Sequence, residues 1–428
     1  MEATAAPSAA APLQESDRAV LLDALRGFSL FGVCLANLFT SFSLWGETGA
    51  PAPASLATAA TDPLAAFLIR ALIDGKFYSL FSLLFGIGFA VQLQRSQARG
   101  DGGLRTYRRR LWVLFGIGLA HLLLVWNGDI LAFYALVGLL LVRLRTISDR
   151  ALLRWVVLLL LLPVPLWAVF WLGGGWKAPV PLTPGLPFYV IGGAIADSMK
   201  MTSLYQAVAT ENWGTYLRIL QGGLFFRFGG LLFQWRVCKV LAMFLLGLWV
   251  GRHQIFRHPT AHLPLLLRVA VWGLALGLPA NLLSAYLNAG SAYDNDEALG
   301  LAHAAPYALG VGPLALAFAA LFALAWPGRA GGMLRQLAPL GRMALTCYLM
   351  QSIIGVLLFY GIGLGLMGQV GPTLLWPLAA AIVGGQLLLC RWWLARYQFG
   401  PVEWLWRSLT YRQWQPLRRA TPPAVAVG

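Results

Sequence analysis

About ten apolar runs of roughly 20 residues constrain this chain more than any other feature. The runs are unbroken rather than alternating, which favours membrane-spanning helices and excludes an outer-membrane barrel. Hydrophobic residues make up 59% of the 428 residues and charged residues 11%, whereas soluble domains average about 25% charged residues. The sequence therefore predicts an all-α, polytopic transmembrane helical bundle. The expected spans lie near residues 22–45, 76–94, 110–127, 129–144, 151–173, 237–251, 266–287, 301–326, 343–366 and 372–394.

Basic residues predict how these spans cross the membrane. Arginine-rich segments recur after every second expected span, so ten crossings place all of them on one side. The positive-inside rule makes that side cytoplasmic, together with both termini. The net charge of +16 is then better explained by contacts with the lipid bilayer than by nucleic acid, and a bacterial inner membrane is the expected location. The basic segments are 95–110, 143–154, 252–268, 328–342 and 391–419.

Four regions are expected along the chain. Residues 1–17 resemble a disordered tail, and 18–173 form an N-terminal transmembrane half. Residues 174–236 form an extracytoplasmic segment that is basic, against the positive-inside trend. This segment is either an amphipathic cap or a site for an anionic or sugar-containing substrate. Residues 237–428 form a C-terminal transmembrane domain with an interfacial tail of mixed aromatic and basic residues.

Asp23 and Arg26 stand at the start of the first expected span, in the run Leu-Asp-Ala-Leu-Arg-Gly. Ionisable groups near a membrane cost a few kcal/mol unless they are paired or hydrated, so they mark functional candidates. The two residues are three apart and therefore share a helix face within pairing distance. The topology places them at the cytoplasmic mouth of the bundle.

Three further polar residues are candidates for chemistry inside the membrane. Asn37 and His121 each lie eleven residues beyond an inner-side arginine, about 16 Å along a helix. Asp129 follows His121 in a short turn. An aspartate that orients a histidine makes a general base; alternatively, His121 bonds a neighbouring helix and Asp129 caps the next one. The sequence contains no metal-binding motif, and no metal is expected.

A glycine pattern occurs twice and indicates close helix packing. Leu84-Phe-Gly-Ile-Gly-Phe-Ala90 is repeated as Leu114-Phe-Gly-Ile-Gly-Leu-Ala120. Small residues at such spacing allow helix backbones to approach one another.

Several blocks resemble the YeiB-like bacterial membrane proteins. The first is Leu22–Gly32 with Asn37, and the second, Gly341–Ser352, resembles the family's C-terminal domain of unknown function. Two more are Phe399–Tyr411 and Gly128-Asp-Ile-Leu followed by Tyr134-Ala-Leu136. The first helix is similar to those of transmembrane acyltransferases, with Asp23, Arg26 and Gly27 matching the shared pattern.

The resemblance implies transfer of an acyl group from a cytoplasmic donor such as acyl-CoA to a sugar on the far side. Arg26 would then be a structural or donor-site residue. Acyltransferase-3 proteins place a histidine at the position of Asn37, and the heparan-glucosaminide acetyltransferase type carries one in the next external loop. Residues 38–63 contain no histidine, so we infer that His121 replaces it.

Three hypotheses follow. In the first, the chain is a membrane acyltransferase: Arg26, Arg110 or Arg342, beside Asp23, meets the acyl-CoA phosphates, and His121 with Asp129 deprotonates a glycan or lipid acceptor. Asn37 then polarises the acyl carbonyl. In the second, the same polar groups line a transport path for a small solute or lipid. In the third, the chain is a non-enzymatic envelope scaffold.

Overall fold

The computed structural model describes residues 20–45, 52–99, 103–173, 185–201, 203–287 and 298–419. Within these ranges the regular structure is helical, apart from one isolated β-bridge between Tyr397 and Arg418. The all-α class predicted from the apolar runs is therefore confirmed. The tail expected at residues 1–17 lies outside the described residues.

Helices occupy every segment that was predicted to span the membrane. The N-terminal half contains α1 (Val20–Asn37), a π-helical turn η2 (Leu38–Phe42), α2 (Asp62–Leu72), α3 (Lys76–Arg99), α4 (Gly103–Leu124), α5 (Leu131–Arg143), α6 (Asp149–Leu161) and α7 (Pro163–Leu172). The middle contains α8 (Leu186–Ser198), α9 (Leu204–Val208), α10 (Trp213–Phe233) and α11 (Arg236–Arg252). The remainder contains α12 (Leu263–Leu287), α13 (Ala298–Ala325), α14 (Arg329–Arg335), α15 (Ala338–Arg342), α16 (Ala344–Phe359), α17 (Pro372–Arg396) and α18 (Pro401–Tyr411).

Six helical segments in the described ranges are long and apolar enough to cross a bilayer. A seventh is counted when α10 and α11, bent by 68° at a short break, are taken as one span. α5 and α16 are apolar but shorter, and α4 carries arginines in its first turns. The protein is thus an integral, multi-pass membrane protein, and the ten crossings remain a prediction. The six segments are Val20–Phe42, Asp62–Arg95, Asp149–Phe170, Pro259–Leu287, Ala304–Ala325 and Pro372–Arg396.

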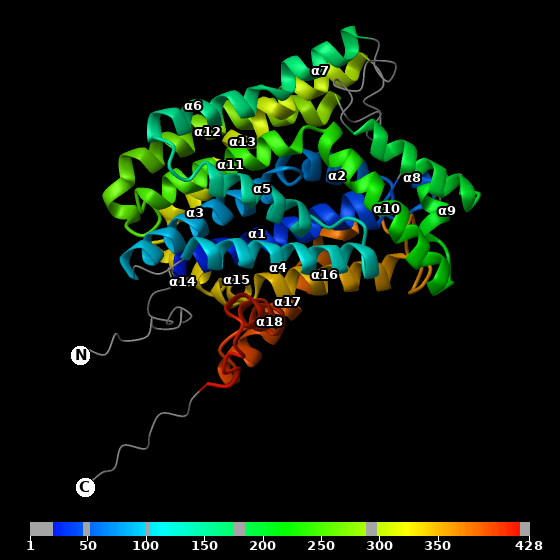
Figure 1. Ribbon diagram of the computed structural model, residues 1–428. Helices are drawn as coiled ribbons and strands as arrows, with labels where there is room; N and C mark the ends of the chain where they lie inside the picture. The colour runs from blue at the N-terminus through cyan, green and yellow to red at the C-terminus, as the bar shows by residue number, and fades with distance from the viewer. Residues whose placement is uncertain are drawn as a thin grey trace.

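α1 lies inside the bundle, in contact with α3, α15, α16 and α17 (Figure 1). Glycines allow the closest helix approaches. A Cβ on Gly27 of α1 would stand 2.2 Å from the carbonyl oxygen of Leu337, and one on Gly341 would stand 1.7 Å from that of Asp23. Because only a glycine leaves room there, α15 packs directly against the charged start of α1.

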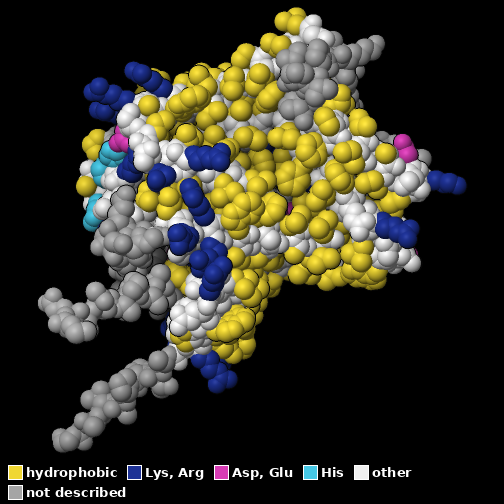
Figure 2. All heavy atoms as spheres, in the orientation of Figure 1, with side chains coloured by type: hydrophobic (Ala, Val, Ile, Leu, Met, Phe, Trp, Pro, Cys, Tyr) yellow, Lys and Arg dark blue, Asp and Glu magenta, His cyan; other side chains and the backbone are white. Residues whose placement is uncertain are grey.

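The basic segments meet at one end of the bundle. Arg252 donates to the carboxylate of Asp149 and to the carbonyl oxygens of Arg145 and Ile147. Arg109 donates to the carbonyl oxygen of Thr410, which joins α4 to α18. Figure 2 shows most visible Lys and Arg side chains at this end and a broad apolar surface across the rest of the face. The positive-inside rule predicts that this end faces the cytoplasm.

Candidate functional site

A cavity of about 1060 Å³ lies along α1. Its walls include residues of α1 and η2 from Val20 to Ser41 and residues of α3 from Phe77 to Arg95. At 1.5 Å per residue, the distance from Asp23 to Ser41 is about 27 Å, close to the ~30 Å thickness of a hydrocarbon core. The cavity therefore follows the transmembrane path of α1 for most of its length.

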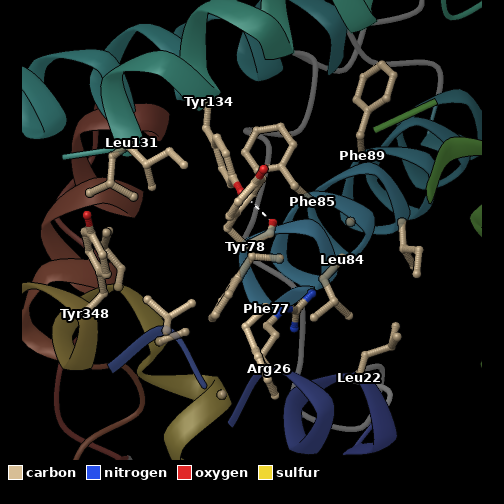
Figure 3. Close-up of a pocket in the computed structure, with 18 of the residues that line it drawn as sticks. Leu22, Arg26, Phe77, Tyr78, Leu84, Phe85, Phe89, Leu131, Tyr134 and Tyr348 are labelled. Carbon is tan, nitrogen blue, oxygen red and sulfur yellow. Dashed lines mark hydrogen bonds between the residues drawn. The ribbon is translucent and has the colours of Figure 1, made fainter. Parts of the chain in front are cut away.

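Guanidinium groups gather at the end of the cavity where α1 begins, which we call the arginine end. Arg26 donates to the carboxylate of Asp23 at 2.5 Å, so the predicted pair is present. The Arg26 side chain rises from α1 towards Leu84 of α3 (Figure 3). Arg110 is near enough to Arg26 for electrostatic repulsion, and Arg342 also lines the cavity. The arginines that line this end are Arg26, Arg95, Arg110, Arg257, Arg342 and Arg407.

Local packing explains why the arginine end forms. Gly341 packs on the backbone of Asp23, and the next residue, Arg342, lines the cavity. Arg110 is held by stacking on Trp406, with 4.1 Å between Cζ and the ring centre, and by donating to the side chain of Gln92 at 3.3 Å. Three of the sequence blocks that resemble the YeiB-like proteins therefore meet around one space.

Asn37 lines the same cavity further along α1, where the α-helix becomes the π-helical turn η2. Single π turns often mark functional positions because they re-aim side chains. Within the part of the chain that the structure describes, the Asn37 amide has no hydrogen-bond partner, and its side chain is half-buried. The amide is therefore free to bind a ligand group in the cavity.

His121 and Asp129 form the pair that their spacing predicts. Nδ1 of His121 lies 3.0 Å from Oδ1 of Asp129, and both side chains are buried. Asp129 also accepts from the backbone N–H of Ala132, so it caps the first turn of α5 as well. When the carboxylate is ionised it only accepts, so a neutral His121 ring then carries its proton on Nδ1 and presents the lone pair of Nε2. Nε2 has no hydrogen-bond partner among the described residues.

The His121–Asp129 pair does not line the cavity. Two aromatic residues that do line the cavity stand against the histidine ring. Its ring centre is 5.6 Å from that of Tyr348 and 6.2 Å from that of Trp126. The structure thus brings Asp23, Arg26, Asn37, Arg110 and Arg342 into one space and leaves His121 and Asp129 one side-chain layer away.

The middle of the cavity is aromatic, which the sequence did not single out. Phe77, Phe85, Tyr134 and Tyr348 face this space from three helices (Figure 3). The hydroxyl of Tyr134 donates to the carbonyl oxygen of Tyr78 at 2.7 Å and lies 2.8 Å from the hydroxyl of Ser82. In the sequence these residues lie in ordinary apolar helix segments, so nothing in the local pattern identifies them as cavity residues.

α18 covers part of the arginine end, where Glu403, Trp406 and Arg407 line the cavity. The Glu403 carboxylate is buried and accepts from the backbone N–H groups of Leu345 and Thr346 and from the Thr346 hydroxyl. Burial raises the pKa of Glu403, and these hydrogen bonds partly oppose the shift. The tail expected to lie on the membrane surface is therefore tied to the N-terminus of α16.

Arg227 of α10 fixes the turn that carries Asp129. Its Nε donates to the carbonyl oxygen of Asp129 at 2.8 Å and one terminal nitrogen donates to that of Gly128 at 2.7 Å. Arg227 and Arg236 both line the cavity. In the sequence, the basic charge of residues 174–236, which runs against the positive-inside trend, is the feature that indicates this wall of the cavity. No group of three metal-ligating side chains occurs among the described residues.

Comparisons with known proteins agree on one group of relatives. The model of a family described as "Protein of unknown function (DUF418)" matches residues 250–413. The chain is 30% identical to YxaH of Bacillus subtilis (strain 168), over 96% of this chain and 98% of that protein. It is 28% identical to YeiB of Escherichia coli (strain K12), over 92% of this chain and 97% of that protein. No solved structure matches the chain.

Proposed function

The chain belongs to the YeiB-like DUF418 family of membrane proteins, and from this premise and the shape of its cavity we propose that it is a membrane acyltransferase. The acyl donor is acyl-CoA, and the acceptor is an envelope glycan or lipid. One observation carries the proposal: a cavity along α1 joins a cluster of arginines to an aromatic, apolar passage. A thioester with a phosphate-rich head and an apolar acyl end has the matching distribution of charge.

In this proposal the donor enters from the arginine end, which faces the cytoplasm of a bacterial inner membrane. Arg26, Arg110 and Arg342 bind its phosphates, since guanidinium groups pair with phosphate through two parallel hydrogen bonds. Asp23 keeps Arg26 oriented. The acyl end then extends towards Asn37, whose amide donates to the thioester carbonyl oxygen.

The proposed reaction is attack of an acceptor hydroxyl or amine on the thioester carbonyl carbon. Nε2 of His121 takes the acceptor proton, while Asp129 holds the ring in the required tautomer. The carbon–sulfur bond then breaks, and the CoA thiolate receives the proton as it leaves. Because Tyr348 and Trp126 separate His121 from the cavity, this step requires one of these rings to rotate when the substrates bind.

The test separates binding from transfer. Purified protein in detergent is titrated with acetyl-CoA and longer acyl-CoA, and membranes are incubated with donor labelled in the acyl group. We expect Arg26→Gln to weaken binding at least tenfold. His121→Ala should keep binding and lose label transfer by at least a hundredfold, and the exposed His258→Ala serves as the matched control. Folded wild-type protein that binds no acyl-CoA would contradict the proposal.

Transport is the second candidate, favoured by one specific observation. The cavity follows α1 over the depth of a bilayer, whereas the His121–Asp129 pair stands outside it. A transport path for a lipid or solute needs a cavity of this length and does not need the His121–Asp129 pair. Flux in proteoliposomes that survives His121→Ala and is lost on Arg26→Gln would support transport over transfer. Unchanged phenotypes for Arg26, His121 and Asp129 variants would instead support a scaffold.

A further inference from the structure

Among the described residues, three carboxylates line the cavity, and two of them have partners. Asp23 accepts from Arg26, and Glu403 accepts from backbone N–H groups at the start of α16. The third carboxylate, Asp74, accepts no hydrogen bond and forms no salt bridge with any residue that the structure describes. It lies within the apolar segment Asp62–Arg95, where ionisable side chains mark functional positions by default. Asp74 is therefore placed to contact a ligand in the cavity.

Asp74 lies at nearly the same depth as Asn37. α1 and α3 are antiparallel, and Gly32 of α1 packs against the ring of Phe77 of α3. Asn37 stands five residues beyond Gly32, and Asp74 stands three residues before Phe77, in the turn that precedes α3. The two side chains therefore lie within one helical turn, about 5 Å, of each other in depth. Because both line the cavity, one ligand can reach both.

Two hydroxyl groups add to the polar groups at this level. Thr40 and Ser41 follow Asn37 in η2 and line the cavity. The Thr40 hydroxyl donates to the carbonyl oxygen of Ala36 at 2.9 Å, which leaves its oxygen available as an acceptor. It also lies 3.3 Å from the Ser41 hydroxyl. A ligand that carries several hydroxyl groups of its own matches this set of acceptors and the Asn37 amide.

The charges around Asp74 favour a neutral ligand. Lys76 is fully buried and close enough to Asp74 to interact with it electrostatically. Arg227 and Arg236 also line the cavity, and both already donate to oxygens of neighbouring residues. A cationic ligand would be repelled by these three basic side chains, and an anionic ligand would be repelled by the Asp74 carboxylate.

Aromatic rings supply the apolar wall of this part of the cavity. Phe77 and Tyr78 come shortly after Asp74 and line the cavity (Figure 3). Trp126 lines it too and stacks on Phe42 of η2, with 4.7 Å between the ring centres. The faces of aromatic rings are electron-rich, so the C–H groups of a sugar ring pack well against them. Ligand sites commonly combine such apolar walls with a few polar groups.

We propose that Asp74 binds the hydroxyl groups of a neutral sugar, next to the position of Asn37. The carboxylate accepts from neighbouring hydroxyls of one sugar ring, and the Thr40 hydroxyl accepts from another. In the proposed acyl transfer this sugar is the acceptor, and one of its hydroxyls stands beside the thioester carbonyl that Asn37 holds. That role rests on the proposed function, whereas binding of the sugar does not. The sugar is either free or the headgroup of a glycolipid.

The experiment measures binding to the full-length protein in a polyoxyethylene detergent, which contains no sugar. The probes are the hexyl β-D-glycosides of glucose, galactose and mannose, with hexyl phosphate and hexyltrimethylammonium as charged competitors. We expect at least one glycoside to bind and neither competitor to displace it. Tighter binding of the hexyl than of the methyl glycoside identifies a glycolipid headgroup, and equal binding identifies a free sugar.

The matched variants are Asp74→Asn and Asp197→Asn. Asp74→Asn should weaken glycoside binding at least tenfold, because it replaces a charge-assisted hydrogen bond with a neutral one. Asp197 is exposed on α8, and its variant should match the wild type. No binding of any glycoside, displacement by either charged probe, or wild-type affinity in Asp74→Asn would overturn the proposal.

Removal of single hydroxyls from the sugar distinguishes contact from a structural role of Asp74. The wild type should bind at least one deoxy analogue tenfold more weakly than the parent glycoside, and Asp74→Asn should bind that analogue and the parent equally. The same loss in both proteins would mean that Asp74 acts only through the fold. Thr40→Val is the second variant should Asp74→Asn not fold. It removes an acceptor at nearly constant shape and should weaken binding roughly fivefold, so wild-type affinity there would contradict the site.

Acyl-CoA titration separates this site from acyl transfer. Asp74 lies away from the arginine end, so Asp74→Asn should bind acyl-CoA like the wild type. Sugar binding by a protein that binds no acyl-CoA contradicts acyl transfer and leaves this site standing. Acyl transfer by the wild type, together with sugar binding that is unchanged in Asp74→Asn, overturns this site and leaves acyl transfer standing.

Discussion

At the scale of single residues, the site depends on side chains that do two things at once. Asp129 contacts the ring nitrogen of His121 and also caps α5. Glu403 lines the cavity and also caps α16. Such residues couple the stability of the bundle to the electrostatics of the cavity, so their variants must be compared in stability as well as in activity.

Glu403 provides a test of this coupling at the residue scale. Glu403→Ala leaves two backbone N–H groups and the Thr346 hydroxyl without their acceptor, and we expect a loss of about 3 kcal/mol in the free energy of unfolding. Glu403→Gln keeps a side-chain oxygen for the N–H groups and should fold with near wild-type stability at acidic pH, where the carboxyl is protonated. Thermal unfolding in one detergent measures both variants. Equal stability of the Ala and Gln variants would contradict the importance of these bonds.

The raised pKa of Glu403 predicts how the stabilities of the wild type and of Glu403→Gln change with pH. A carboxyl whose pKa is higher in the folded state binds its proton more tightly there. Its contribution to stability is therefore complete below the unfolded-state pKa and is lost as the pH rises through the folded-state pKa. We expect Glu403→Gln to gain stability relative to the wild type between pH 4 and pH 8. A difference that is constant or shrinks over this range would contradict the shift.

At the scale of elements, the repeated Leu-Phe-Gly-Ile-Gly pattern packs differently in its two copies. In α3 the first glycine is enclosed: a Cβ on Gly86 would stand 2.1 Å from the carbonyl oxygen of Phe244. In α4 the second glycine of the pattern is enclosed, because a Cβ on Gly118 would stand 2.3 Å from the backbone nitrogen of Ala132. Gly116 has no atom within 4 Å of such a Cβ. One glycine in each copy therefore has the predicted packing role, but it is the first glycine in α3 and the second in α4.

Alanine substitutions test this register. Gly86→Ala and Gly118→Ala force two backbones apart, and each should lower the free energy of unfolding by about 2 kcal/mol. Gly116→Ala is the matched control and should be neutral or stabilising by up to about 1 kcal/mol, because alanine favours the helix over glycine. The midpoint of thermal unfolding in detergent ranks the three. Equal effects at Gly116 and Gly118 would contradict the packing described.

At the scale of the whole molecule, the basic end and the opposite end define an orientation in the membrane. We expect the basic end to face the cytoplasm. Ala54→Cys, on the opposite end, should react with a membrane-impermeant maleimide in intact cells. Thr260→Cys, in the basic loop before α12, should react only after the cells are opened. The four native cysteines are buried, which keeps the background low. The reverse pattern of labelling would overturn the orientation.

Sequence reasoning located the helices because an apolar run is a local property, and the charged start of α1 because Asp23 and Arg26 are only one turn apart. It found the His121–Asp129 contact because the two residues are eight apart, across one short turn. It did not place that pair outside the cavity, since the covering ring of Tyr348 comes from a helix far along the chain. It also missed the α10–α11 break: no proline or glycine marks Gln234 and Trp235, and the break depends on the backbone conformation of one tryptophan.

The length of the cavity along α1 has an electrical consequence. A passage through a low-dielectric slab carries part of the transmembrane voltage, so charges that move within it do work with or against the membrane potential. A charge that moves from the arginine end to the middle of α1 crosses about half of the slab. That movement corresponds to roughly 1 kcal/mol per charge for each 100 mV. With the arginine end on the expected cytoplasmic side, the membrane potential drives anions from that end into the cavity.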